Sequence, residues 1–224
     1  MRADRLVLGL FGVASVLNVI AAGIGSRPLD WATKPLLLPL LALWFYLNHR
    51  ARGVAPTTGI LAALLFSWAG DVALQFAGTT AFVSGMALFG AAHVCYVTTF
   101  VRHGAPARMR AMPLLLVPIG YAVFLVGALT WLWPALSEAG LAVPMAVYGT
   151  LLSSTAALAA AFGWRTALGG GLFLISDLLI AVGVADAFTI PGPPVWVMVT
   201  YIAAQFLLAT GWTARREAQP AAGA

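Results

Sequence analysis

Eight apolar stretches recur along this chain, each close to the roughly 20 residues that an α-helix needs to cross a bilayer core. Of the 224 residues, 62% are hydrophobic and 8% are charged, too few polar side chains to cover a water-facing surface. The sequence therefore predicts an all-α, single-domain membrane bundle of eight transmembrane helices over residues 1–224. The predicted spans are 6–25, 33–47, 56–76, 80–101, 112–131, 141–162, 168–188 and 195–213, followed by a disordered tail at 217–224.

The arginines predict the orientation, because cytoplasmic loops of membrane proteins retain positive charge. With eight spans and a cytoplasmic N-terminus, ten arginines fall on the cytoplasmic side and only Arg27 falls on the other. The ten are Arg2, Arg5, Arg50, Arg52, Arg102, Arg108, Arg110, Arg165, Arg215 and Arg216. We therefore expect both termini to be cytoplasmic in a multi-pass protein of a bacterial inner (plasma) membrane. A cleaved signal peptide at the first span is the alternative, but it would leave seven helices and spoil this asymmetry.

Composition also limits the classes of partner and site. Cys95 is the only cysteine, so an intrachain disulfide and a multi-cysteine metal site are excluded. The net charge of +5 is accounted for by topology, and no basic cluster is interleaved with aromatic residues, so nucleic-acid binding is not expected. We expect no cofactor and no metal; the oligomeric state stays open.

Tryptophans support the span boundaries, since indole rings favour the membrane interface. Six of them fall near predicted span ends: Trp31, Trp131, Trp133, Trp164, Trp196 and Trp212.

Potentially charged side chains that fall within the spans include Lys34, Asp71, His93 and Asp177. Such a group costs several kcal/mol inside a bilayer unless it is paired, neutralised or hydrated, so each one is a candidate functional residue. Asp71 and Asp177 are predicted to form the centre of the site, on helices that run in the same direction and at overlapping depths.

Asp71 has polar neighbours on its own helix. Ser67 at i−4 and Gln75 at i+4 share its face, which predicts a polar stripe that faces the bundle interior. Gly70 beside it allows another helix to approach closely. The alternative role for Asp71 is a purely structural polar clamp between helices.

Asp177 has no such stripe, since leucines and an isoleucine flank it. These surroundings favour the neutral, protonated carboxylic acid. Lys34 either snorkels to the interface, pairs with a carboxylate or holds a phosphate. Polar side chains on other helices are expected to support the site: His93, Tyr96, Tyr148, Tyr201 and Gln205. A hydrogen-bonded core histidine is the alternative for His93.

Several short segments, in order and on the expected helices, carry a family pattern. They are Thr33-Lys34-Pro35-Leu36, Phe66-Ser67-Trp68-Ala69-Gly70-Asp71, Gly90-Ala91-Ala92-His93-Val94-Cys95-Tyr96, Val147-Tyr148, Gly171-Leu172-Phe173-Leu174-Ile175-Ser176-Asp177, and Thr200-Tyr201 with Gln205. With these segments the chain resembles the lysoplasmalogenase family, the YhhN-like membrane proteins, over all eight spans. It departs locally in a triple glycine at 169–171 and a proline-rich loop at 191–194.

The resemblance implies hydrolysis of the vinyl-ether bond of a lysoplasmalogen, a lysophospholipid, to a fatty aldehyde and a glycerophospho-alcohol. Vinyl ethers break when carbon is protonated and water captures the resulting oxocarbenium ion, so one acid and one base are needed. We expect Asp177 to be the acid and Asp71 the base, although the reverse assignment is also open.

Other functions remain compatible with two membrane aspartates. A proton-coupled transporter of a small or lipid-like solute is the main alternative. The two halves of the chain are weakly similar in sequence, and some transporters are built from two parallel repeats. An intramembrane aspartyl protease would need Gly-x-Gly-Asp, whereas the chain has Trp68-Ala69-Gly70-Asp71. A retinal protein would need Lys34 as its Schiff base, and a metal hydrolase would use Asp71, His93 and Asp177.

Overall fold

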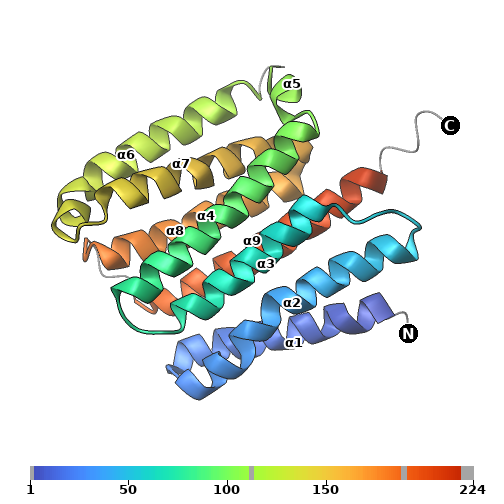
Figure 1. Cartoon of the computed structure of the whole chain (residues 1–224), viewed down its shortest axis with the longest axis horizontal. Helices are drawn as coiled ribbons and strands as arrows, with labels where there is room; N and C mark the ends of the chain where they lie inside the picture. The colour runs from blue at the N-terminus through green and yellow to red at the C-terminus, as the bar shows by residue number, and fades with distance from the viewer. Residues whose placement is uncertain (1–2, 111–113, 188–190, 218–224) are drawn as a thin grey trace.

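A computed structural model describes residues 3–110, 114–187 and 191–217, and within them the chain is helical with no strand. The helices are α1 (Ala3–Ile24), α2 (Arg27–Ala51), α3 (Thr58–Leu74), α4 (Thr79–Arg102), the short α5 (Ala105–Met109), α6 (Leu116–Glu138), α7 (Ala142–Ala159) with the 3-10 turn η1 (Ala160–Phe162), α8 (Trp164–Val184) and α9 (Pro193–Glu217). The long helices form one bundle, and α1 begins at the same end of the bundle at which α9 ends (Figure 1).

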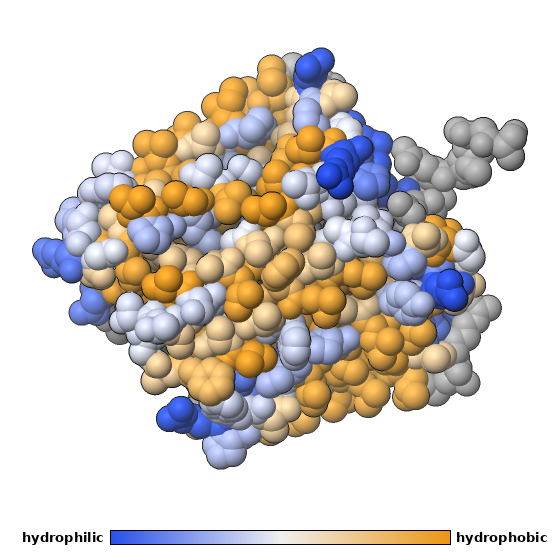
Figure 2. Space-filling model, viewed as in Figure 1, coloured by the Kyte–Doolittle hydropathy of each residue, from blue (hydrophilic) through white to orange (hydrophobic). Residues whose placement is uncertain are grey.

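Six helical segments are long and apolar enough to cross a membrane: α1, α4, α6, α7 with η1, α8 and most of α9. Large apolar side chains are also exposed on the outside of the bundle, and Figure 2 shows them spread over the length of several helices. Both observations indicate a multi-pass membrane protein, because such a surface is stable only against lipid.

The predicted second span, 33–47, lies inside a longer helix. Helix α2 begins at Arg27 and ends at Ala51, because Pro28 suits a first helical turn and the polar residues at both ends continue the backbone hydrogen bonding. The predicted ends of the span mark where the sequence changes from apolar to polar, and the helix continues past both of them. Lys34 therefore lies in the second turn of a longer helix.

Two further spans are displaced from their predicted positions. The predicted fifth span, 112–131, starts outside the described residues and its helix α6 runs from Leu116 through Pro134 to Glu138. The predicted seventh span, 168–188, corresponds to α8, which starts at Trp164 because Gly163 (φ 104°) ends the preceding turn. The predicted disordered tail begins too early, since α9 reaches Glu217; residues 218–224 lie outside the described part.

A proline inside α2 leads to a hydrogen bond between α2 and α3. Pro39 has no backbone N–H, so the carbonyl of Pro35, four residues earlier, has no donor within the helix. The indole of Trp68 donates this missing hydrogen bond at 2.9 Å. The tryptophan next to the Gly70-Asp71 pair thus fixes α3 against α2.

Glycines bring the helices that carry the site close together. A Cβ on Gly70 would lie 2.7 Å from the Phe89 ring of α4, which confirms the predicted close approach. On α8, a Cβ on Gly169 would lie 2.9 Å from the Leu208 backbone nitrogen, and one on Gly170 would lie 2.8 Å from the Ala156 Cα. The triple glycine therefore lets α8 pack tightly between α9 and α7.

The tryptophans divide into two groups. Trp31, Trp131, Trp133, Trp164 and Trp196 are exposed, as the interface prediction requires. Trp212 is instead fully buried: its ring packs on Phe100 and Phe162, and its indole donates to Thr57 Oγ1 at 2.9 Å. It was wrongly predicted to lie at the interface, because proximity to a span end does not specify which face of the helix a residue occupies.

Candidate functional site

Asp71 lies near the end of α3 and faces the interior, with 5% of its surface exposed. Ser67 and Gln75 are buried on the same face, so the predicted polar stripe is confirmed. The Tyr201 hydroxyl on α9 donates a hydrogen bond to Asp71 Oδ2 at 2.7 Å. This carboxylate therefore has a strong donor that comes from the far end of the chain.

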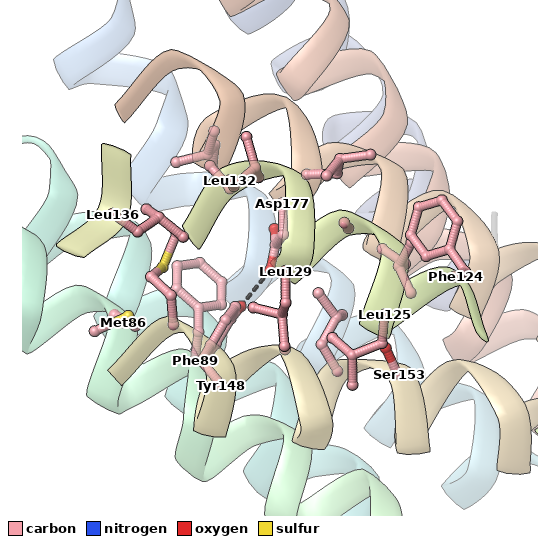
Figure 3. Close-up of a pocket in the computed structure, with 18 of the residues that line it drawn as sticks. Met86, Phe89, Phe124, Leu125, Leu129, Leu132, Leu136, Tyr148, Ser153 and Asp177 are labelled. Atoms are coloured by element: carbon pink, nitrogen blue, oxygen red, sulfur yellow. Dashed lines mark hydrogen bonds between the residues drawn. The ribbon is translucent and has the colours of Figure 1, made fainter. Parts of the chain in front are cut away.

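Asp177, on α8, has a different tyrosine partner. The Tyr148 hydroxyl on α7 donates a short hydrogen bond to Asp177 Oδ2, drawn as the dashed line in Figure 3. Unlike Asp71, Asp177 is partly exposed, and it lines a cavity.

His93 extends this contact into a chain of hydrogen bonds. Its Nδ1 lies 3.2 Å from Thr155 Oγ1, and that hydroxyl itself donates to the Leu151 carbonyl at 3.0 Å. Since the Thr155 proton is used in this way, Thr155 must accept from His93 Nδ1–H, which leaves Nε2 as an acceptor. Nε2 lies 3.4 Å from the Tyr148 hydroxyl. Tyr148 can therefore donate its single proton either to Asp177 or to His93.

The two aspartates make no hydrogen bond to each other within the described residues, although they lie close enough for their charges to interact. An aromatic cluster joins their surroundings. Phe173 packs on both His93 and Tyr201, and Phe89 packs on Phe173 and Tyr201.

Tyr96 and Gln205 form a second buried polar contact beside Asp71. The Tyr96 hydroxyl donates to Gln205 Oε1 at 2.8 Å, and both side chains are fully buried. Gln205 lies one helical turn beyond Tyr201 on α9. The two residues predicted to support the site from the eighth span therefore lie on one face directed at α3 and α4.

Lys34 pairs with a carboxylate, one of the three roles expected for it. Its Nζ lies 3.1 Å from Asp30 Oδ1, and Asn18 on α1 donates to the same oxygen at 3.0 Å. Lys34 is also close enough to Asp71 for Coulombic attraction. The positive charge therefore lies beside the Asp71 half of the site.

The cavity beside Asp177 has a volume of about 100 Å³ and is almost entirely apolar. Side chains from α3, α4, α6, α7 and α8 line it, and Figure 3 shows leucines of α6 around the hydrogen-bonded pair Asp177 and Tyr148. Helix α6 packs mainly against α7 and lies at the edge of the bundle, so the outer wall of the cavity faces the lipid (Figure 1). A carboxyl group in the wall of an apolar cavity is suited to protonate a lipid-like molecule.

Two polar residues of this region were not identified from the sequence. Asp30 stands four residues before Lys34, and the i, i+4 spacing rule for ion pairs could have found it. Thr155 stands seven residues after Tyr148, on the same face of one helix. For metal binding, no cluster of three or more His, Cys, Asp or Glu side chains occurs among the described residues.

The chain matches the family model described as "YhhN family" over residues 29–212. It is 31% identical to "Lysoplasmalogenase" of Mycobacterium bovis, over 85% of this chain and 72% of that protein. It is also 31% identical to "Lysoplasmalogenase TMEM86A" of Bos taurus (80% and 77%) and 32% identical to "Lysoplasmalogenase TMEM86B" of Homo sapiens (83% and 77%). No solved structure gives a significant match. The resemblance found in the sequence is thus confirmed, and the chain belongs to the YhhN family.

Proposed function

We propose that this protein is a membrane hydrolase that cleaves the vinyl-ether bond of lysoplasmalogens, releasing a fatty aldehyde and a glycerophospho-alcohol. The names of its relatives support this substrate. The observation that carries the chemistry is the position of Asp177, at an apolar cavity and within hydrogen-bonding distance of Tyr148. An aliphatic chain suits that lining, and the acid then meets the vinyl ether at its reactive end.

In the first step, Asp177 acts as the general acid. It transfers its proton to the vinyl carbon farther from the ether oxygen, and the π electrons form that C–H bond, leaving an oxocarbenium ion. Tyr148 then turns its hydroxyl proton from His93 Nε2 to the new carboxylate of Asp177. The relay therefore stabilises both protonation states of the acid.

In the second step, Asp71 acts as the general base. Water adds to the oxocarbenium carbon and gives one proton to Asp71. The substrate thereby becomes a hemiacetal. The hemiacetal then gives its hydroxyl proton to Asp177 while its bond to the glycerol oxygen breaks and that oxygen takes the proton from Asp71. This releases the aldehyde and the alcohol and restores both aspartates. The Tyr201 hydroxyl favours the ionised form of Asp71, and Lys34 adds an attraction that its partner Asp30 partly offsets. Lys34 would also attract the phosphate of the substrate.

The proposed topology has eight transmembrane helices with both termini in the cytoplasm. In addition to the six apolar spans, α2 and α3 cross the membrane, since they pack inside the same bundle between α1 and α4. Helix α3 is apolar but has only 17 residues, and α2 is less apolar because it carries polar residues that face the interior, such as Thr33. The arginine asymmetry supports this orientation in a bacterial inner membrane.

The test is mass spectrometry of lysoplasmalogen incubated with purified protein, with release of aldehyde and glycerophospho-alcohol as the expected result. Asp71→Asn and Asp177→Asn should each lower the rate about 100- to 10,000-fold in a folded protein. Asp186→Asn is the matched control, because Asp186 lies beyond the end of α8 in a left-handed conformation that asparagine also adopts. Full activity of either site variant would refute the acid–base pair. Uptake of intact lipid into liposomes without cleavage would instead favour a transporter.

A further inference from the structure

Helices α3 and α9 run antiparallel and are joined at two levels. Near one end of the bundle the Trp212 indole donates to Thr57 Oγ1, and toward the other end the Tyr201 hydroxyl donates to Asp71. From the first hydrogen-bonded pair to the second, the residue number rises along α3, from Thr57 to Asp71, and falls along α9, from Trp212 to Tyr201. The residue one turn before Asp71 and the residue one turn after Tyr201 therefore lie at the same level.

These two residues are Ser67 and Gln205, each about 6 Å along its helix from the Asp71–Tyr201 hydrogen bond. Both side chains are 0% exposed. Ser67 Oγ nevertheless finds no hydrogen-bond partner among the described residues, and Gln205 Nε2 approaches the Tyr201 hydroxyl without forming a hydrogen bond of normal geometry. Gln205 Oε1 is already used, since it accepts from Tyr96. Two unsatisfied N–H or O–H donors therefore lie beside the carboxylate.

A buried donor without an acceptor costs about 1–3 kcal/mol, and ordered water is the usual way in which folded proteins satisfy such groups. A water at this level would accept from Ser67 Oγ–H and from Gln205 Nε2–H and donate one of its own protons to Asp71. A carbonyl or carboxylate oxygen would satisfy the two donors but would have no proton for Asp71.

We propose that Ser67 and Gln205 hold the hydrolytic water on Asp71, an assignment that rests on the proposed vinyl-ether hydrolysis. The water's oxygen forms the new bond to the oxocarbenium carbon while one of its protons passes to Asp71. Each donor holds one lone pair of the water before the attack, and one of these two hydrogen bonds breaks as its lone pair forms the C–O bond; the donors therefore orient the water rather than activate it. Ser67 and Gln205 act only after Asp177 has protonated the substrate.

The test separates the two steps by running the reaction in D₂O. In the wild-type protein water captures the cation faster than the cation reverts, so the aldehyde gains deuterium next to its carbonyl and the recovered substrate gains none. In Ser67→Ala and Gln205→Met we expect aldehyde release to fall about tenfold for each lost hydrogen bond. The slower capture lets the cation return its proton or deuteron to Asp177, so the recovered substrate becomes deuterated at the vinyl carbon.

Controls make each outcome decisive. Asp177→Asn should give neither aldehyde nor deuterated substrate, because protonation itself is lost. Ser15→Ala is the matched serine control, since its hydroxyl bonds only within α1. Undiminished rates in Ser67→Ala and Gln205→Met, or slower release from folded variants without deuterium in the substrate, would overturn the water site and leave the hydrolase intact. A wild-type protein that releases no aldehyde would overturn the proposed function and this site together.

Discussion

The Tyr201 hydroxyl lies 2.7 Å from Asp71 Oδ2, across 130 residues of sequence. Asp177 is likewise paired with a tyrosine, Tyr148, from another helix. The two halves of the sequence are weakly similar, in that Tyr96 follows Asp71 and Tyr201 follows Asp177, each by about 25 residues. The hydrogen bonds do not follow this similarity, because Tyr201 donates to Asp71 and not to Asp177.

Removing the Tyr201 hydroxyl should weaken the base. Tyr201→Phe keeps the ring contacts with Phe89 and Phe173 but deprives ionised Asp71 of a hydrogen bond worth about 1.5–3 kcal/mol. We expect kcat to fall about 10- to 100-fold, measured by aldehyde release. Tyr46→Phe, at an exposed tyrosine, should keep wild-type activity. Equal kcat values in Tyr201→Phe and wild type would contradict the role of Tyr201.

Thr155 should set the tautomer of His93. Thr155→Val keeps the shape but loses the acceptor for Nδ1–H, so we expect lower activity and a changed ¹⁵N spectrum of the imidazole. Thr155→Ser restores the hydroxyl and should restore both. The chain has only three histidines, which makes the assignment practical. A Thr155→Val spectrum identical to that of the wild type would rule out this positioning role.

The Trp68 indole should stabilise α2 at its internal proline, Pro39. Trp68→Phe leaves the Pro35 carbonyl without its donor, and we expect the free energy of unfolding in detergent to fall by about 1–3 kcal/mol. Trp133→Phe changes a similarly exposed indole with no hydrogen-bond partner among the described residues, and should have a much smaller effect. Equal losses in the two variants would show that ring size, not the hydrogen bond, matters.

Two glycines of α8 should respond oppositely to alanine. Gly170→Ala puts a methyl group 2.8 Å from the Ala156 Cα, and such overpacking costs about 1–3 kcal/mol. Gly183→Ala has nothing within 4 Å of the new Cβ, so higher helix propensity should stabilise the protein by up to about 1 kcal/mol. Thermal unfolding in one detergent measures both. A neutral Gly170→Ala would contradict the tight packing of α7 against α8.

Filling the apolar cavity should shift chain-length preference. Ala181 lines it one helical turn from Asp177, and Ala181→Phe takes space from the aliphatic chain. At about 0.8 kcal/mol per CH₂, displacement of two methylenes lowers kcat/KM for long chains roughly tenfold and affects short chains less. Val143→Phe, on the exposed face of α7, is the control. An equal loss of kcat/KM for short and long substrates would show that the aliphatic chain of the substrate binds outside this cavity.

Much of the fold followed from the sequence, because hydropathy and helical period are local properties. The apolar stretches predicted the helical bundle, and the spacing of Ser67, Asp71 and Gln75 predicted the buried stripe. Helix ends were less predictable. Polar residues such as Arg27 and Asp30 continue α2 because its backbone hydrogen bonds do not depend on side-chain polarity.

The sequence by itself determined that two carboxyl groups lie inside a membrane bundle and which face of α3 is polar. Only the tertiary structure decided which tyrosine binds each aspartate and that Asp177, not Asp71, meets the apolar cavity. The chain has five tyrosines, and several lie at comparable depths. Their partners depend on how each helix is rotated against neighbours distant in sequence, which the packing of the whole bundle fixes and no local pattern records.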